Sequence, residues 1–291
     1  MTEASGAEAN LREYSDVEYV FEPRDHSIPR FRDYMQTVWD RRAFMVASAE
    51  ADLRGGTSGT VLGEFWRVLD PLFQALIYWF LFNAIRGKGG NSGYFLMVVG
   101  GVFLFNYTMT SLNEGGRAIQ RSKGLVLNST FPLATLPMSV VYRATLDLGP
   151  TLAVYAVLHL LFGGAIGVGL TMLPFLLVLQ LLINVGLALI FATLTVYIPD
   201  MGKLLNYILR VLMFVTPVIY PASQLAAAPA SLRAVLVLNP LYSLFVSYQT
   251  IILGGVPAAG QVVQSIFWAV ILPVIGYRLF VSRERGFALR L

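Results

Sequence analysis

Apolar residues along this chain gather into long blocks. From residue 68 onward, six apolar stretches follow one another, separated by polar, Gly-rich or Pro-rich segments. A helix of roughly 20 apolar residues crosses the hydrocarbon core of a bilayer. Within that core each backbone N–H and C=O must find a partner inside its own segment, which favours helices over open strands. The pattern therefore predicts an all-α, polytopic membrane protein with six spans, at about residues 68–85, 94–112, 136–162, 172–197, 204–219 and 262–281.

The chain before the first span divides into two parts. Residues 1–29 are acidic and polar with no apolar period, which predicts a cytoplasmic tail. Residues 30–48 repeat apolar side chains at helical spacing, which predicts an amphipathic helix on the membrane surface. A small soluble helix packed on the tail is the alternative. The Gly-rich run at 55–59 is expected to end this helix. The repeating apolar residues are Phe31, Tyr34, Met35, Val38 and Met45.

The segment 220–260, before the last span, is irregular. It contains several prolines and a 13-residue apolar run, Leu241–Leu253. That run is too short to cross a bilayer, so it predicts a re-entrant or interfacial helix.

Composition supports a membrane protein. The chain is 56% hydrophobic and only 13% charged, and its mean hydropathy is +0.64, whereas soluble domains carry roughly 25% charged residues. The net charge of +4 does not indicate nucleic acid, because the basic residues flank apolar segments. By the positive-inside rule, their positions put both termini in the cytoplasm. These residues are Arg54, Arg67, Arg117, Arg121, Lys123, Lys203 and the run from Arg278 onward.

Catalytic and metal-binding motifs are missing from the sequence. It has no cysteine and only two histidines, and neither HExxH nor GxSxG occurs. Gly87-Lys88-Gly89 lacks the remaining residues of a Walker A loop. We therefore expect no catalytic residue, no bound metal and no cofactor in this chain.

Ionisable residues inside the predicted spans are candidates for function, because their burial in lipid is costly. Arg143 and Asp147 are four residues apart and share one helix face, so they form either a structural ion pair or part of a transport site. Arg210 has no partner nearby in the sequence and either lines a polar path or snorkels. His159 is interpreted as a hydrogen-bonded packing residue.

Aromatic residues make up 13% of the chain and cluster near the predicted span ends. Their faces can stack on sugars while their hydroxyls form hydrogen bonds, although an ordinary interfacial belt accounts for most of them. The candidates for a substrate path are Tyr78, Trp79, Tyr107, Tyr142, Arg143, Tyr155 and Arg210.

Several motifs, taken in order, resemble the membrane subunit of ABC-2 type exporters, the Wzm-like permeases of polysaccharide ABC transporters. The pattern Leu62-Gly63, Trp66 and Pro71 precedes the first span, and Phe131-Pro132 with Leu136-Pro137 follows the second. The strongest signature is Thr216-Pro217-Val218-Ile219-Tyr220-Pro221 followed by Asn239-Pro240-Leu241. The family's Arg-Tyr-Arg run is absent before Leu62, and Pro199 replaces the usual arginine before Asp200. The chain looks closest to actinobacterial exporters of lipid-linked cell-wall galactan.

This resemblance implies an ABC-2 transmembrane domain over 62–291 in the plasma membrane. Two copies would form the pore with two ABC ATPase subunits, which would bind ATP and Mg, and a lipid-linked glycan would be the cargo. The segment 113–130 would couple to the ATPase, and the region 220–260 would form the outer gate. The implied coupling residues are Arg117, Arg121 and Lys123, and the implied gate residues are Tyr220, Pro221, Asn239 and Pro240.

Three other functions remain open. One is an ABC-2 exporter of a drug or small amphiphile, and another is a secondary transporter for a small solute. The third is a membrane enzyme acting on polyprenyl lipids, for which Asp200 alone is insufficient.

Overall fold

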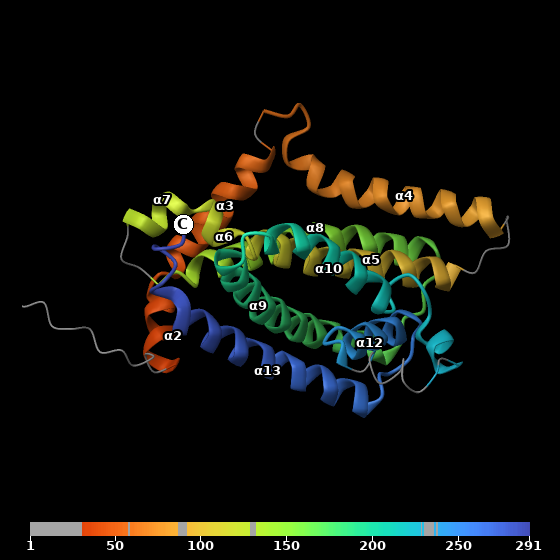
Figure 1. Ribbon diagram of the computed structural model, residues 1–291. Coiled ribbons are helices and arrows are strands. Elements are labelled where there is room, and N and C mark those ends of the chain that lie inside the picture. Colours follow the sequence, from red (N-terminus) through yellow and green to blue (C-terminus); the bar gives the residue numbers. More distant parts are fainter. Residues whose placement is uncertain are drawn as a thin grey trace, which may run out of the picture.

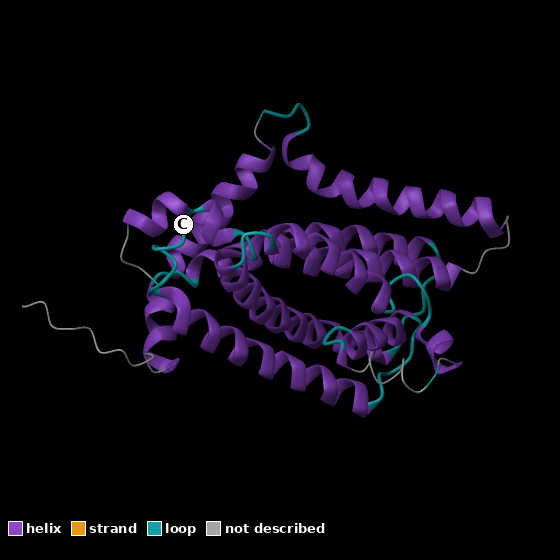
Figure 2. Cartoon of the chain, in the orientation of Figure 1, coloured by secondary structure: helices purple, strands orange, loops and turns teal. Residues whose placement is uncertain are grey.

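The computed structural model describes residues 31–57, 59–86, 92–128, 132–227, 229, 236 and 238–291. Every regular element in these ranges is a helix (Figures 1 and 2), which confirms the predicted all-α class. The predicted tail at 1–29 lies outside the described residues, as do the turn at 87–91, residues 129–131 and most of 228–237.

Four helices of the described chain are long and apolar enough to cross a bilayer. They are α5 (Ser92–Gly115), α8 (Thr135–Leu161), α9 (Leu173–Tyr197) and α13 (Ala259–Glu284). The short helix η3 (Val168–Met172) leads directly into α9. These four helices lie where the apolar pattern predicts the second, third, fourth and last spans.

The remaining two predicted spans correspond to α4 (Trp66–Arg86) and α10 (Met201–Val215), so the count of six spans is not confirmed. At 1.5 Å per residue the 15 residues of α10 rise about 22 Å, less than a hydrocarbon core of about 30 Å. The predicted span continued to residue 219. Thr216 is extended, with ψ of 136°, because the residue before a proline avoids the α conformation.

The predicted surface helix at 30–48 is instead two helices, α2 (Phe31–Asp40) and α3 (Arg42–Thr57). The α3 helix continues through Gly55 and Gly56, where the sequence predicts its end. It packs along α8 and buries Ala49 completely. Tertiary packing of this kind outweighs the helix-propensity cost of about 1 kcal/mol per glycine.

Shorter helices connect the long ones. The 3₁₀ turn η1 (Gly63–Phe65) precedes α4, and α6 (Ala118–Arg121) and α7 (Lys123–Asn128) lie between α5 and α8. The 3₁₀ helix η4 (Ala222–Ala227) and α12 (Tyr242–Ile252) lie between α10 and α13. The 11-residue α12 occupies the run from which the sequence predicts a re-entrant helix, and it is almost entirely buried.

The α5 helix occupies the centre of the bundle. It is buried nearly all round and packs against α8, α9 and α12. Aromatic rings fill the space on its α12 side, where Phe105 and Phe245 meet edge to face with centroids 5.9 Å apart. The α4 helix, by contrast, stands apart from the bundle above α5 and α8 (Figure 1). Of the α4 side chains that the structure describes, only Pro71 and Ala75 are buried.

The most extensive contact between two helices joins α9 and α13, and two glycines make their close approach possible. A Cβ added at Gly186 would lie 2.5 Å from the Pro273 nitrogen, and one at Gly276 would collide with the Gly186 carbonyl. Small residues at helix crossings let backbones approach, which is the main source of helix association within lipid.

We therefore expect Gly186→Ala to lower the free energy of unfolding by about 1–3 kcal/mol, the usual cost of overpacking. Gly149→Ala on α8 is the matched control, because a Cβ there meets no atom within 4 Å. Thermal unfolding of both variants in detergent checks the expectation. Equal melting temperatures for the two variants would contradict the close approach of α9 and α13.

Candidate functional site: a polar cleft beneath helix α4

Two adjoining hollows lie beneath α4, the first between α4, α5 and α8 and the second between α3, α4 and α8. One encloses about 600 Å³ and the other about 550 Å³. They share four lining residues and are called here, together, the α4 cleft. The shared residues are Asp70, Pro71, Asp147 and Thr151.

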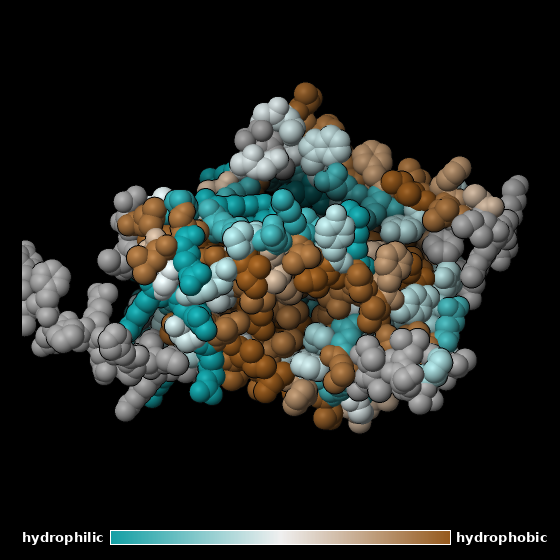
Figure 3. All heavy atoms as spheres, viewed as in Figure 1, coloured by the Kyte–Doolittle hydropathy of each residue, from teal (hydrophilic) through white to brown (hydrophobic). Residues whose placement is uncertain are grey.

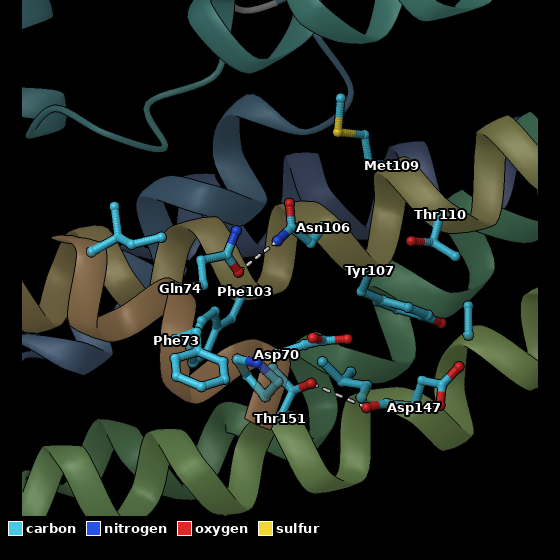
Figure 4. A pocket seen from close by; sticks show the side chains of 14 residues that line it. Asp70, Phe73, Gln74, Phe103, Asn106, Tyr107, Met109, Thr110, Asp147 and Thr151 are labelled. Carbon is cyan, nitrogen blue, oxygen red and sulfur yellow. Dashed lines mark hydrogen bonds between the residues drawn. The ribbon is translucent and has the colours of Figure 1, made fainter. Parts of the chain in front are cut away.

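Amide, hydroxyl and aromatic side chains line the larger hollow (Figure 4). From α4 come Phe73 and Gln74, and from α5 comes Asn106, whose Nδ2 donates to Gln74 Oε1 at 3.0 Å. This amide pair ties the middle of α4 to α5. The other polar lining residues of α5 and α8 are Tyr107, Thr110, Asp147 and Thr151.

A cluster of four charged residues joins α4, α5 and α8 at one end of the cleft. Arg67 Nε lies 2.9 Å from Asp147 Oδ1, and Arg67 Nη2 also donates to the Leu146 carbonyl at 3.2 Å. Arg143 Nη2 lies 3.1 Å from Glu114 Oε2, and its Nε lies 3.8 Å from Asp147 Oδ2. The four side chains are 23–35% exposed, so solvent screens them only in part.

The charge balance of the cleft favours an uncharged ligand. Only Asp70 and Asp147 carry charge among the residues that line the larger hollow. In the smaller hollow the positive charges of Arg67 and Arg143 are already paired with acids. An anion would therefore meet net negative charge, whereas hydroxyl groups would find amide, hydroxyl and carboxylate partners.

A space-filling view shows the same division of the surface (Figure 3). Hydrophilic residues lie along a hollowed band beneath α4 and at the end that carries α2, α6 and the C-terminus. Hydrophobic residues cover much of the face below that band.

The seven residues predicted to line a substrate path do not come together. Tyr107 lines the larger hollow, with its hydroxyl 2.8 Å from Thr145 Oγ1, and Arg143 lines the smaller one. Trp79 faces a separate apolar hollow of about 360 Å³, and Tyr155 lines a different apolar pocket. The remaining three are Tyr78, packed against the core, Tyr142, half-buried on α8, and Arg210, exposed on α10.

The interpretations of the ionisable residues hold in part. Arg143 and Asp147 do pair along α8, but each has a closer partner on another helix, Glu114 and Arg67 respectively. His159 is buried, with Nε2 3.1 Å from the Ala165 carbonyl, as a packing residue should be. Arg210 has its guanidinium 6.0 Å from the centroid of the Tyr207 ring.

The predicted coupling residues lie at the end of the molecule that carries α6, α7 and the C-terminus (Figure 1). Arg117 is partly buried, and its Nη2 donates to the Gly202 carbonyl at 2.5 Å, at the start of α10. Arg121 is exposed. Lys123 is also exposed and its Nζ donates to the Leu291 carbonyl.

The same end holds α2 against α13. Tyr34 of α2 donates its hydroxyl to Glu284 Oε2 at 2.8 Å, and its ring meets the Tyr277 ring at 5.6 Å. Burial, and then the Glu284 carboxylate, raise the pKa of the Tyr34 hydroxyl well above its ordinary value, so it stays protonated. Trp39 remains 67% exposed on the opposite side of α2.

The four predicted gate residues lie in two loops that hydrogen bonds connect. Asn239 Nδ2 donates to Thr216 Oγ1 at 2.9 Å. Gln249 of α12 donates to the carbonyls of Pro217 and Tyr220 at 2.7 and 2.8 Å, and accepts from the Ala222 N–H at 3.0 Å. The loop that contains Tyr220 and Pro221 is thus fastened to α12.

Sequence reasoning missed several residues that the structure makes central. Arg67, Gln74, Asn106 and Glu114 build the cleft and its charged cluster. Gln249 fastens the loop that contains the predicted gate residues Tyr220 and Pro221. Their signal is a polar side chain within an apolar segment, which must find a partner inside the protein. The partners themselves are far apart in the sequence, so the pattern does not reveal them.

Within the described ranges, no group of three or more His, Asp or Glu side chains is placed to hold a metal ion.

Comparison with known proteins identifies the family. Residues 56–253 match the family described as ABC-2 type transporter. This chain belongs to that family. The predicted resemblance is thereby confirmed, and the protein is an ABC-2 type permease subunit with several membrane-crossing helices.

The ABC-2 permease is also similar to curated relatives over most of its length. The O-antigen export system permease protein RfbA of Myxococcus xanthus is 27% identical over 255 residues, which are 87% of this chain and 97% of the relative. Two proteins of the same name from Klebsiella pneumoniae are 22% identical over 245 residues, 84% of this chain and 93% of each relative.

The charged cluster of the permease gives a direct test of the cleft geometry. In a double-mutant cycle of Arg67→Ala and Asp147→Ala, we expect a coupling energy of about 1 kcal/mol or more, because both groups are largely removed from water. The exposed pair Arg54–Glu50, at 3.0 Å, is the matched control. Its coupling should be about 0.5 kcal/mol or less. Chemical denaturation of the variants measures both coupling energies. Equal coupling energies for the two pairs would contradict the partial burial of the charged cluster.

Proposed function

We propose that this ABC-2 permease carries a lipid-linked polysaccharide across the plasma membrane. The observation that carries the proposal is the α4 cleft, in which aromatic faces stand beside amide, hydroxyl and carboxylate groups and the cations are already paired. Such a lining suits the hydroxyl-rich chain of a glycan. The similarity to O-antigen export permeases over more than four-fifths of the chain supports a polysaccharide cargo.

Galactan of the cell wall is the specific cargo that we propose, in a form linked to a lipid carrier. The sugar chain would lie along the α4 cleft, in contact with Phe73, Asn106 and Tyr107. The lipid anchor would remain in the bilayer beside α4, whose apolar side chains Leu76 and Phe80 are exposed.

The working assembly in this proposal is two copies of the permease with two ATPase subunits. The ATPases bind ATP and Mg, and both termini of the permease face them from the cytoplasm. Arg121 and Lys123 lie exposed on the short helices α6 and α7, where a docked partner could reach them.

A mechanical connection leads from the coupling segment to the gate. Arg117 holds the first turn of α10 through the Gly202 carbonyl, and α10 ends at Val215, directly before the gate loop. A displacement of α6 by the ATPase would therefore move α10 along its axis. The loop beyond it is held by Asn239 and Gln249, so the displacement would reach the hydrogen bonds that close the gate.

Co-purification tests the assembly and the cargo together. We expect the permease to purify in a two-plus-two complex with an ABC ATPase, and its ATP hydrolysis in lipid to rise on addition of lipid-linked galactan. Stimulation of ATP hydrolysis by a small amphiphile instead of the glycan would contradict the proposal that the cargo is a glycan. A permease that purifies alone and moves a solute down an ion gradient would overturn the exporter.

A bulky side chain in the cleft tests the glycan path. We expect Thr151→Trp to abolish galactan-stimulated hydrolysis and to lower glycan export at least tenfold, because Thr151 lines both hollows. Ala153→Trp, two residues along α8 on an exposed position outside the cleft, is the control and should retain both activities. Wild-type export by Thr151→Trp would place the glycan elsewhere.

A further inference from the structure

A second, apolar pocket of about 240 Å³ lies within the bundle between α5, α8, η3 and α12. It is separate from the α4 cleft except for Phe103, which borders both. Its floor is Gly100, where an added Cβ would lie 2.9 Å from the Tyr155 ring and from Ile252. The α5 backbone at Gly100 therefore lies in close contact with side chains of α8 and α12.

The pocket offers hydrocarbon and almost no polar surface. Three polar side chains border it, and each is hydrogen-bonded to protein. Tyr155 donates to the Leu96 carbonyl at 3.2 Å, His159 Nε2 lies 3.1 Å from the Ala165 carbonyl, and Tyr248 donates to Gln180 Oε1 at 2.9 Å. A polar ligand would find no partner here, and apolar cavities of this kind stay dry and take up apolar molecules.

The pocket opens toward the outside of the bundle at membrane depth. Ala156, Leu160 and Ile166, which belong to its lining, are exposed, and Leu160 and Ile166 are 67% and 72% exposed. On α8 the lining runs from Leu152 to Leu160, within nine residues of the helix end at Leu161. Nine residues of helix span about 14 Å, so this lining lies within one half of a hydrocarbon core of about 30 Å.

We infer that this pocket binds the end of one hydrocarbon chain of a bilayer phospholipid, in the half of the membrane opposite the end of the molecule that carries α6, α7 and the C-terminus. At 240 Å³ the pocket is smaller than the roughly 300–1,000 Å³ of sites that hold drug-sized ligands. It is larger than a cavity of about 150 Å³ that takes up benzene. The end of a flexible hydrocarbon chain that enters between Leu160 and Ile166 requires a volume between these two values. The phospholipid headgroup stays outside, in the membrane interface.

A bound chain would support the region that carries the gate. The pocket touches Ile251 and Ile252 at the end of α12, and beyond them Gly254 and Gly255 press against Gly167 and Gly169 of the η3 segment. No side chain larger than hydrogen fits at these crossings, so the α12 end and η3 move together. A lipid chain wedged between α8 and this unit would hold the end of α12 in place.

The test uses full-length protein and a phosphatidylglycerol that carries a photoreactive diazirine near the end of one acyl chain. We expect wild-type adducts on pocket residues, and at least a fivefold loss of those adducts in Ala156→Trp, which closes the mouth. Ala153→Trp, on an exposed position of the same helix outside the pocket, is the matched control and should label as wild type does. Ile166→Trp, at the other lip, should reproduce the loss if Ala156→Trp folds poorly.

Three results would overturn the inference. Unchanged adducts in both mouth variants would do so, and so would adducts spread evenly along the exposed side of α8. The third is a disulfide-linked dimer formed by Ala156→Cys, which would assign the mouth to a second copy; the sequence has no other cysteine to confuse this readout. None of these outcomes depends on the cargo, because the photolabel and the mouth variants concern the pocket alone. The cargo is tested separately by Thr151→Trp in the α4 cleft.

Discussion

Polar groups at hydrocarbon depth must find their partners within the protein, because lipid supplies none. For the backbone this requirement produces helices, which satisfy their own N–H and C=O groups. For the side chains it produces a set of hydrogen bonds that decide how the helices of this permease pack. Gln180 on α9 shows the effect most clearly. It is fully buried, donates to the Leu104 carbonyl and to Thr108 Oγ1 on α5, and accepts from Tyr248 on α12. One amide thus sets the relative positions of three helices.

Side-chain hydrogen bonds also join elements toward both ends of the bundle. At the end that carries α6, α7 and the C-terminus, Gln120 donates to the Thr195 carbonyl at 2.7 Å and Thr195 donates to the Gly116 carbonyl. These two bonds join α6 to α9. At the other end Gln249 holds the loop after α10. These bonds give the buried side chains of Thr195 and Gln249 partners within the protein. Between these bonds, α9 and α13 need only the small residues Gly186 and Gly276 to pack closely.

The α4 helix is attached differently, and this difference gives the permease its cleft. Arg67 of α4 pairs with Asp147 and donates to the Leu146 carbonyl, and Gln74 of α4 accepts a hydrogen bond from the Asn106 side-chain amide. The side chains of these contacts line the two hollows and do not belong to a packed interface. The space beneath α4 therefore remains open to polar groups. A helix held in this way can separate from α5 and α8 at a lower cost than α9 can separate from α13.

Apolar periodicity and charge were sufficient to predict part of this structure. The block lengths identified α5, α8, α9 and α13 as long membrane helices, because hydropathy over some 20 residues reflects a requirement of the bilayer and not of any one neighbour. The family was also readable from the sequence, since its motifs lie in short local segments such as Thr216-Pro217 and Asn239-Pro240.

Other features depended on contacts between residues far apart in the chain, and only the tertiary structure decided them. Arg143 and Asp147 were predicted as a pair because four residues separate them, but Arg67 and Glu114 come to them from other helices. The aromatic residues predicted to share one path face different pockets, because spacing on a helix does not tell which neighbour each face meets. The sequence by itself determined the four segments that form helices long and apolar enough to cross a membrane, because length and apolar character can be read without knowing any neighbour. The packing of those helices decided which polar side chains meet, and therefore where the cleft lies.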